Sequence, residues 1–285
     1  MNGLYDAQSY QSFITADKVR IAYKISGHGL PVLALAGLTR DGRDFDFMAQ
    51  TLPFECQLIR PDSRGRGASD WADPTTYTIL QETQDVIALM DHLGIEKAAI
   101  IGTSRGGLIA MVMAMMVPDR LAGVFFNDIG PELDPVGLSR IDSYLGVQPK
   151  AKTLEDMAVA LSKISGFEGV PMDRWREQAA RQFEQTDDGL KLSYDPDLRV
   201  AFEMGRNQPQ PDLWPMFDAC LGRPLGVVRG ENSDLLSAET VEKMIERCPD
   251  LVTAIAAGRG HVPFLDEPES IAALSEWFSR INGQY

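Results

Sequence analysis

Short apolar runs separated by longer stretches of helical periodicity dominate the chain from residue 30 onward. Continuous apolar runs of this length are typical of parallel strands that helices cover on both faces of a sheet. Each run is followed by Gly, Asp or Asn near its carboxyl end, and the six occupy residues 32–36, 57–60, 98–102, 123–127, 225–228 and 252–256. The pattern predicts an α/β fold built on one doubly wound, mostly parallel sheet.

The segment that precedes these runs has a period of two. Val19, Ile21, Tyr23 and Ile25 alternate with other residues after a polar turn at 16–18, which predicts a β-hairpin at one edge of the sheet. Between the later runs, apolar side chains recur at helical spacing over 78–93, and residues 105–116 are apolar almost all round. We expect two helices there, the second buried against the sheet.

The strand rhythm stops between residues 131 and 212. Segments 153–164 and 173–183 have helical periodicity, and prolines and glycines divide the region into roughly four short helices. This arrangement predicts a helical cap inserted into the core. The expected domains are a first part of the core at 1–130, the cap at 131–212 and a second part of the core at 213–285.

Composition and charge narrow the class of partner. The chain has 285 residues, 44% of them hydrophobic, and a formal net charge of −14, which repels phosphate backbones and anionic lipid. No targeting segment and no apolar stretch of membrane-spanning length is present. The three cysteines have neither paired nor metal-type spacing. We therefore expect a cytoplasmic protein, monomer or homodimer, with a small-molecule substrate and without nucleic acid, membrane or metal.

One motif carries chemistry. The run at 98–102 leads into Gly102-Thr103-Ser104-Arg105-Gly106 and then into the apolar helix, which is the strand, turn and helix context of a G-x-S-x-G nucleophile elbow. The chain turns so sharply at such a serine that the residues two positions away must be small. Ser104 is therefore the predicted nucleophile.

With this elbow the chain resembles the α/β-hydrolase fold family over essentially its whole length. Further motifs that support the resemblance are the Asp62–Ser69 segment Asp-Ser-Arg-Gly-Arg-Gly-Ala-Ser, Gly260-His261, and Glu267-Pro268-Glu269. The arrangement is similar to capped bacterial esterases, enol-lactonases and carbon-carbon bond hydrolases. Dehalogenases and many epoxide hydrolases of this fold use an aspartate at the elbow, so Ser104 argues against those branches.

The resemblance implies a chain order of serine, acid and histidine. Of the three histidines only His261 follows Ser104, so it is the expected general base. Asp234, after the run at 225–228, is the expected acid. Asp128, after the run at 123–127, and Glu231 are the alternatives, and Asp128 is otherwise expected to cap the entry to the inserted segment or to bind loop amides.

The predicted mechanism is acyl transfer through an acyl-enzyme, without a cofactor. The backbone amides of Leu38 and Arg105 are the expected oxyanion donors, although the loop has Ala36-Gly37 where the family usually has His-Gly. Aromatic side chains of the cap and its neighbourhood, above all Trp175, Trp214 and Phe217, are candidates for the substrate pocket.

Arg40 and Arg105 are candidates for attracting a substrate carboxylate. The sequence thus predicts a serine hydrolase for an ester or lactone of a small, largely apolar substrate. Two alternatives stay open: a carbon-carbon bond hydrolase, which Val262 after the histidine makes less favoured, and a ligand-binding protein with a vestigial triad.

Overall fold

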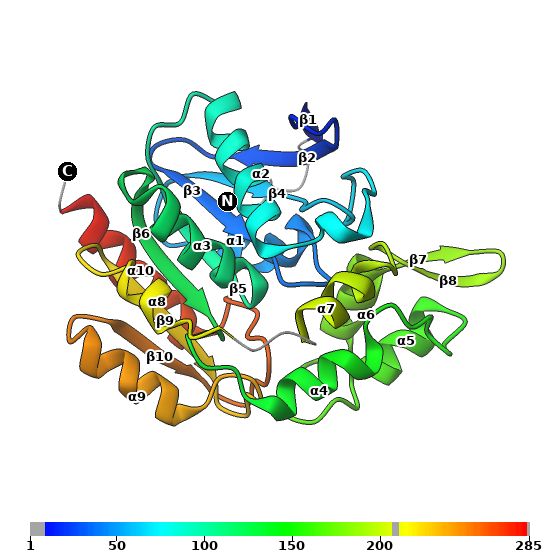
Figure 1. Cartoon of the computed structure of the whole chain (residues 1–285). Coiled ribbons are helices and arrows are strands. Elements are labelled where there is room, and N and C mark those ends of the chain that lie inside the picture. Colours follow the sequence, from blue (N-terminus) through cyan, green and yellow to red (C-terminus); the bar gives the residue numbers. More distant parts are fainter. Residues whose placement is uncertain (1–8, 207–210, 284–285) are drawn as a thin grey trace.

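A computed structural model describes residues 9–206 and 211–283. Its centre is an eight-stranded sheet in the order β1-β2-β4-β3-β5-β6-β9-β10 (Figure 1). The strands are β1 (Gln11–Ile14), β2 (Arg20–Ser26), β3 (Pro31–Leu35), β4 (Gln57–Pro61), β5 (Ala98–Thr103), β6 (Leu121–Asn127), β9 (Leu225–Gly230) and β10 (Val252–Ala256). The pairs from β4 to β10 are parallel, and β2 is antiparallel to both β1 and β4. The six predicted strands and the edge hairpin are confirmed.

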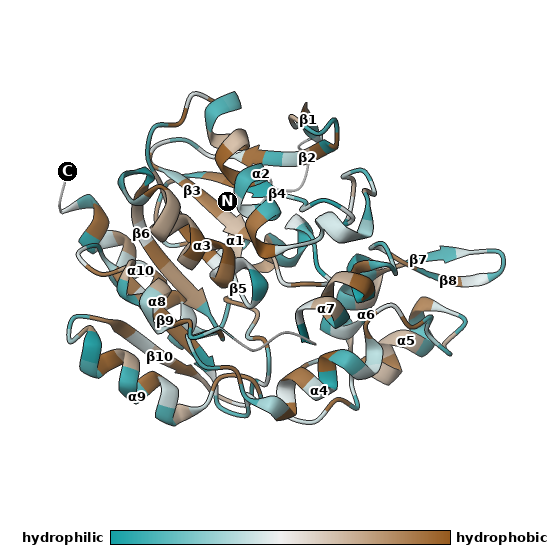
Figure 2. Ribbon diagram, viewed as in Figure 1, coloured by the Kyte–Doolittle hydropathy of each residue, from teal (hydrophilic) through white to brown (hydrophobic). Residues whose placement is uncertain are grey.

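Side chains of each central strand alternate between two hydrophobic layers. In β5, Ala98 and Ile100 belong to one layer and Ala99 and Ile101 to the other. The first layer includes side chains of α2 (Ile79–His92), α3 (Arg105–Met116), α8 (Trp214–Asp218) and α9 (Ala238–Arg247); the second includes side chains of α1 (Asp46–Thr51) and α10 (Pro268–Asn282). Both faces of the sheet are therefore covered, and the central strand β6 and the helix α3 are largely brown in Figure 2.

The segment between β6 and β9 lies beside the sheet (Figure 1). It contains α4 (Pro135–Tyr144), α5 (Leu154–Leu161), α6 (Met172–Gln182) and α7 (Leu198–Arg206). A two-stranded hairpin of β7 (Phe183–Thr186) and β8 (Gly189–Leu192), which the periodicity did not predict, joins α6 to the chain that leads to α7. Residues 207–210 of the expected cap lie outside the described residues.

Hydrogen bonds connect this inserted segment to the loop after β4. The amide of Gly67 donates to the carbonyl of Ser193 at 2.9 Å, and the amide of Asp195 donates to the carbonyl of Gly65 at 2.7 Å. The Tyr77 hydroxyl donates to the Asp195 carboxylate at 2.6 Å in a buried contact. The motif 62–69, which follows β4, is therefore hydrogen-bonded to the inserted segment.

Candidate active site

Ser104 lies at the sharp turn between β5 and α3. Its φ is 50° and its ψ is −114°, a backbone conformation that costs energy for any residue with a side chain. A Cβ on Gly102 would lie 2.5 Å from the amide nitrogen of Gly107, and one on Gly106 would lie 2.0 Å from the carbonyl oxygen of Leu35. The two glycines therefore permit the turn, as the elbow motif predicts.

Ser104, His261 and Asp128 form one line of hydrogen bonds. His261 Nε2 lies 3.0 Å from Ser104 Oγ, and His261 Nδ1 lies 2.8 Å from Asp128 Oδ2. The Asp128 side chain is fully buried, and that of His261 is 8% exposed. A buried carboxylate at Nδ1 favours the tautomer that leaves Nε2 free to accept a proton from the serine.

The expected acid, Asp234, is not the partner of His261. It forms an ion pair with Arg140 of α4, with contacts of 2.6 Å and 2.7 Å. Glu231 instead accepts from the amide of Gly258 at 2.7 Å. Asp128, which the sequence leaves as an alternative acid, occupies the position beside the histidine.

The topology of the sheet explains why Asp128, rather than Asp234, lies beside His261. The carboxyl ends of β6 and β9 are neighbours, with Asn127 paired to Val228, so loops from both strands reach the histidine. Asp128 follows β6 directly at φ 54°, a left-handed conformation that aspartate tolerates better than most residues. Its carboxylate also accepts from the Gly230 amide at 2.8 Å and the Ser233 hydroxyl at 2.7 Å.

The two expected oxyanion donors border the nucleophile. A Cβ on Gly37 would lie 3.7 Å from Ser104 Cβ, so the loop after β3 that carries Leu38 packs against the serine. Arg105 is the first residue of α3, where backbone amides point out of the helix. Both residues therefore belong to segments that border Ser104, and the role of their amides as oxyanion donors stays a prediction.

A buried ionic network contacts both residues that carry these amides, Leu38 and Arg105. Arg66 Nε donates to the Leu38 carbonyl at 2.8 Å, and Arg66 Nη1 donates to Glu82 at 2.7 Å. Glu82 accepts from Arg105 Nε at 2.8 Å, and it belongs to α2. Burial opposes ionisation of Glu82, but Arg105 and Arg66 outweigh it and hold the pKa of this carboxyl below its ordinary value. One carboxylate thus joins the loop after β3 to the start of α3.

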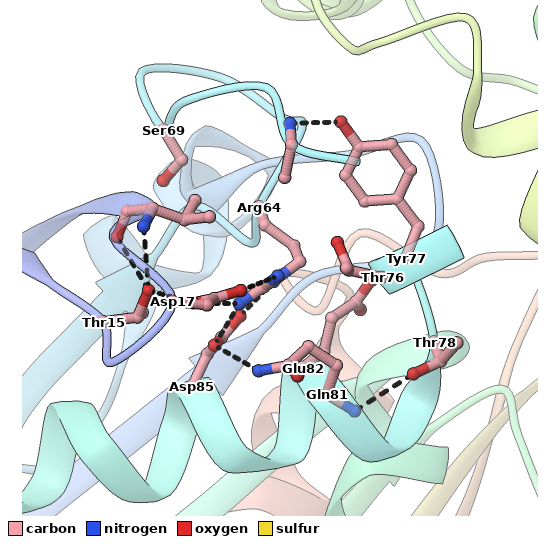
Figure 3. Close-up of polar contacts among 12 residues, drawn as sticks. Thr15, Asp17, Arg64, Ser69, Thr76, Tyr77, Thr78, Gln81, Glu82 and Asp85 are labelled. Carbon is pink, nitrogen blue, oxygen red and sulfur yellow. Dashed lines mark hydrogen bonds and ion pairs between the residues drawn. The ribbon is translucent and has the colours of Figure 1, made fainter. Parts of the chain in front are cut away.

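A second buried arginine lies beside this network. Figure 3 shows Arg64 between Asp17 and Asp85, with Glu82 on the same helix as Asp85. Arg64 donates to Asp85 with two contacts of 2.7 Å and to Asp17 at 2.8 Å. The arginines of the 62–69 motif are therefore structural, and the Arg105 guanidinium is held by Glu82 rather than directed at a substrate.

A cavity of about 410 Å³ borders His261. Trp175 lines it, as predicted, and Trp175 packs against Phe167 and Phe264 with ring centroids 5.6 Å and 6.2 Å away. Arg40 also lines it and donates to Asp44 and Gln178. Burial raises the pKa of the Asp44 carboxyl.

Trp214 and Phe217, which were expected at the pocket, lie elsewhere. Trp214 Nε1 donates to Glu132 at 2.9 Å, and the Arg247 guanidinium lies 4.4 Å from its ring centroid. Phe217 is fully buried against Phe126 in the core. Both residues belong to α8, the helix that precedes β9 and packs on α3. The prediction for these two residues is therefore wrong, since aromatic side chains at helical spacing are more often part of the core than of a pocket.

One group of pocket residues that the sequence did not reveal comes from α4 and the loop after it. These residues are Arg140, Ser143, Tyr144, Val147, Gln148 and Lys150. Short apolar helices and loops carry no periodic signal for a cavity wall, so only the tertiary arrangement identifies them. Within residues 9–206 and 211–283, no cluster of three His, Cys, Asp or Glu side chains is arranged for a metal ion, and no helix could span a membrane.

This fold and site define the chain as a member of the alpha/beta hydrolase family, whose model matches residues 28–274. It is 38% identical to a 3-hydroxybutyrate-oligomer hydrolase of Cupriavidus necator, over 85% of this chain and 86% of that one. A crystal structure of an alpha/beta hydrolase from Novosphingobium aromaticivorans is 40% identical, covers 96% of this chain and 98% of its own, and superposes with a TM-score of 0.89.

A more distant relative is 2-(acetamidomethylene)succinate hydrolase of Mesorhizobium japonicum, 24% identical over 86% of each chain. The relatives thus include hydrolases that are named for different substrates. The chain is a hydrolase of the alpha/beta type, and its substrate has to be argued from its own site.

Proposed function

We propose that this chain is a serine esterase that cleaves short oligoesters of hydroxy acids through an acyl-enzyme at Ser104. The observation that carries the proposal is the position of His261, which hydrogen-bonds Ser104 at 3.0 Å and the buried Asp128 at 2.8 Å. A serine hydroxyl needs such a base to attack a carbonyl at neutral pH.

In the proposed mechanism, Ser104 Oγ attacks the ester carbonyl while His261 Nε2 takes the hydroxyl proton. The amides of Leu38 and Arg105 stabilise the oxyanion, and Asp128 stabilises the imidazolium. The protonated His261 then donates its proton to the leaving alkoxide as the carbon-oxygen bond breaks. Water, activated by His261, hydrolyses the acyl-enzyme and restores the Ser104 hydroxyl.

The substrate class rests on two observations. The relative from Cupriavidus necator is named as a hydrolase of 3-hydroxybutyrate oligomers and aligns over most of both chains. The cavity beside His261 combines aromatic side chains with a few polar ones, as expected of a site for a small ester with an apolar backbone. A cytoplasmic location and a monomeric or dimeric state stay predictions from the sequence.

The test compares wild type, Ser104→Ala and the control Ser279→Ala. Ser279 is exposed on α10, and its hydroxyl donates only to a backbone carbonyl of its own helix. Hydrolysis of p-nitrophenyl butyrate and of a 3-hydroxybutyrate trimer should be lost in Ser104→Ala alone, by roughly 10⁶-fold in kcat. A fluorophosphonate should label only Ser104, as seen by mass spectrometry.

Turnover that survives in Ser104→Ala would overturn the mechanism. Absence of both turnover and labelling in the wild type would favour the ligand-binding alternative instead. Turnover of p-nitrophenyl butyrate without cleavage of the trimer would retain the esterase and overturn the oligoester substrate.

A further inference from the structure

The cavity beside His261 has two chemically different parts. Apolar side chains of α5, α6 and the loop after the histidine supply one part, among them Met157, Leu161 and Trp175. The segment 140–150, from α4 and the following loop, supplies polar and cationic side chains, including Arg140 and Lys150. A ligand that fills this cavity therefore has an apolar portion and an anionic or polar portion.

Charge in the cavity opposes the charge of the whole protein. The cavity is lined by Arg40, Arg140 and Lys150 but by one carboxylate, Asp44, whereas the chain has a formal net charge of −14. Cations that line a cavity in an acidic protein concentrate anionic ligands there against the overall field. Asp44 pairs with Arg40 and Asp234 pairs with Arg140, so Lys150 is the lining cation without an ion pair among the described residues. A cation of this kind favours a substrate with a negative charge.

Arg140 is the cation that lines the same two cavities as His261. It binds Asp234 through Nε and Nη2, and among the described residues its Nη1 has no hydrogen-bond partner. The side chain is 32% exposed and lines the cavity. The Asp234 carboxylate thus holds Arg140 in a fixed orientation while one nitrogen stays available.

A second cavity, of about 280 Å³, adjoins the first. Arg140 and His261 line both, so the guanidinium and the imidazole border a common space. Glu168 and Asp234 make the second cavity acidic, so an anion is expected on the main-cavity side of Arg140. Since His261 gives its proton to the departing oxygen, the leaving group must lie beside the imidazole.

We propose that Arg140, assisted by Lys150, binds a carboxylate on the leaving group of the substrate. The inference rests on the proposed esterase function and deepens it. It assigns the enzyme to esters whose alcohol portion is a short hydroxycarboxylate, so that it removes hydroxy acid units from the carboxylate end of an oligoester. The apolar side chains around Trp175 then receive the acyl portion.

The test uses substrates that differ only in this charge. We would measure hydrolysis of two substrates, the 3-hydroxybutyrate trimer with a free carboxylate and its methyl ester. The proteins compared are wild type, the double variant Arg140→Met/Asp234→Asn and the control Arg206→Met. The double variant removes the ion pair without leaving Asp234 uncompensated. Arg206 belongs to the same inserted segment and pairs with Asp142, but it does not line the cavity.

Wild type and Arg206→Met should prefer the free acid over its methyl ester. In the double variant, the ratio of kcat/KM for the acid to that for the methyl ester should fall about 10- to 100-fold, the value of a charge-assisted hydrogen bond. An unchanged ratio would overturn the carboxylate site, whether or not overall activity falls.

A binding measurement separates this inference from the proposed function. Calorimetric titration of the product, 3-hydroxybutyrate, into each protein should give a Kd at least tenfold weaker for the double variant than for wild type. Equal Kd values would refute the site. Loss of hydrolysis in every protein, with the difference in Kd retained, would refute the esterase proposal alone.

Discussion

The choice between Asp128 and Asp234 as the acid can be decided with one pair of variants. Asp128→Asn keeps the shape of the side chain but replaces one oxygen with an NH₂ group. Asp128 Oδ1 accepts from the Gly230 amide, and Oδ2 accepts from His261 and Ser233. The retained oxygen is expected to face the Gly230 amide, since a second donor there would be repelled.

The NH₂ group would then face His261 Nδ1 and donate to it. The imidazole would carry its proton on Nε2, which could no longer accept the proton of Ser104. The same exchange in other triads lowers kcat about 10⁴-fold, or about 5.5 kcal/mol of transition-state stabilisation. We expect a loss of this size for p-nitrophenyl butyrate, with KM changed severalfold at most.

Asp234→Asn provides the matched comparison. Its ion pair with Arg140 is partly exposed on both sides, so the loss should cost at most about 1 kcal/mol of stability and a few-fold in kcat for the same neutral ester. The assay is steady-state kinetics on both variants, with thermal melting to confirm that each is folded. A 10⁴-fold loss in Asp234→Asn, or near wild-type kcat in folded Asp128→Asn, would refute the assignment.

Three further predictions concern stability. Glu82→Gln leaves Arg66 and Arg105 buried without their shared anion, so urea denaturation should show a loss of about 3–5 kcal/mol; a change below about 1 kcal/mol would contradict this account. Burial and the neighbouring Asp41 carboxylate raise the pKa of Asp62 to about 7, so its contribution to stability should fall as pH rises from its unfolded pKa of about 3.9 to about 7 and then stay constant. Urea unfolding between pH 5 and 8 should show a weaker decline in Asp62→Asn, and an equal slope would reject this interpretation. Gly106→Ala should give little folded protein, since its Cβ would lie 2.0 Å from a backbone oxygen of β3; a melting temperature within a few degrees of wild type would show that the turn can adjust.

The sheet was predictable because burial on both faces leaves a simple trace in the sequence. β5 and β6 are buried along their whole length, so they read as uninterrupted apolar runs. The β7–β8 hairpin was missed for the opposite reason. Its first strand is mostly exposed and polar, and the few buried side chains of the hairpin pack against the inserted segment and Tyr77. Hydrophobic periodicity does not reveal a strand of four residues that buries only a few side chains.

The site was predictable as far as local geometry determines it. The elbow requires Gly102 and Gly106 around Ser104, and these requirements are written in five consecutive residues. The wall of the cavity is different, because α4, α5 and the loop after His261 approach one another only in the folded chain. Trp175 was found and Trp214 misplaced, since an aromatic residue on a short helix looks the same in sequence whether it faces a cavity or the core.

The acid partner of His261 cannot be predicted from the strand topology alone. Because β6 and β9 are neighbours, a carboxylate at the end of either strand can reach the same histidine, so chain order allows both. In the structure Ser233 holds the earlier acid, because its hydroxyl donates to Asp128 and accepts from the amides of Leu235 and Leu236. A small polar side chain there orients the Asp128 carboxylate from the loop after β9, while the next residue, Asp234, points to Arg140. The sequence pattern that matches the observed acid is an aspartate directly after one buried strand and a serine in the loop after the neighbouring strand.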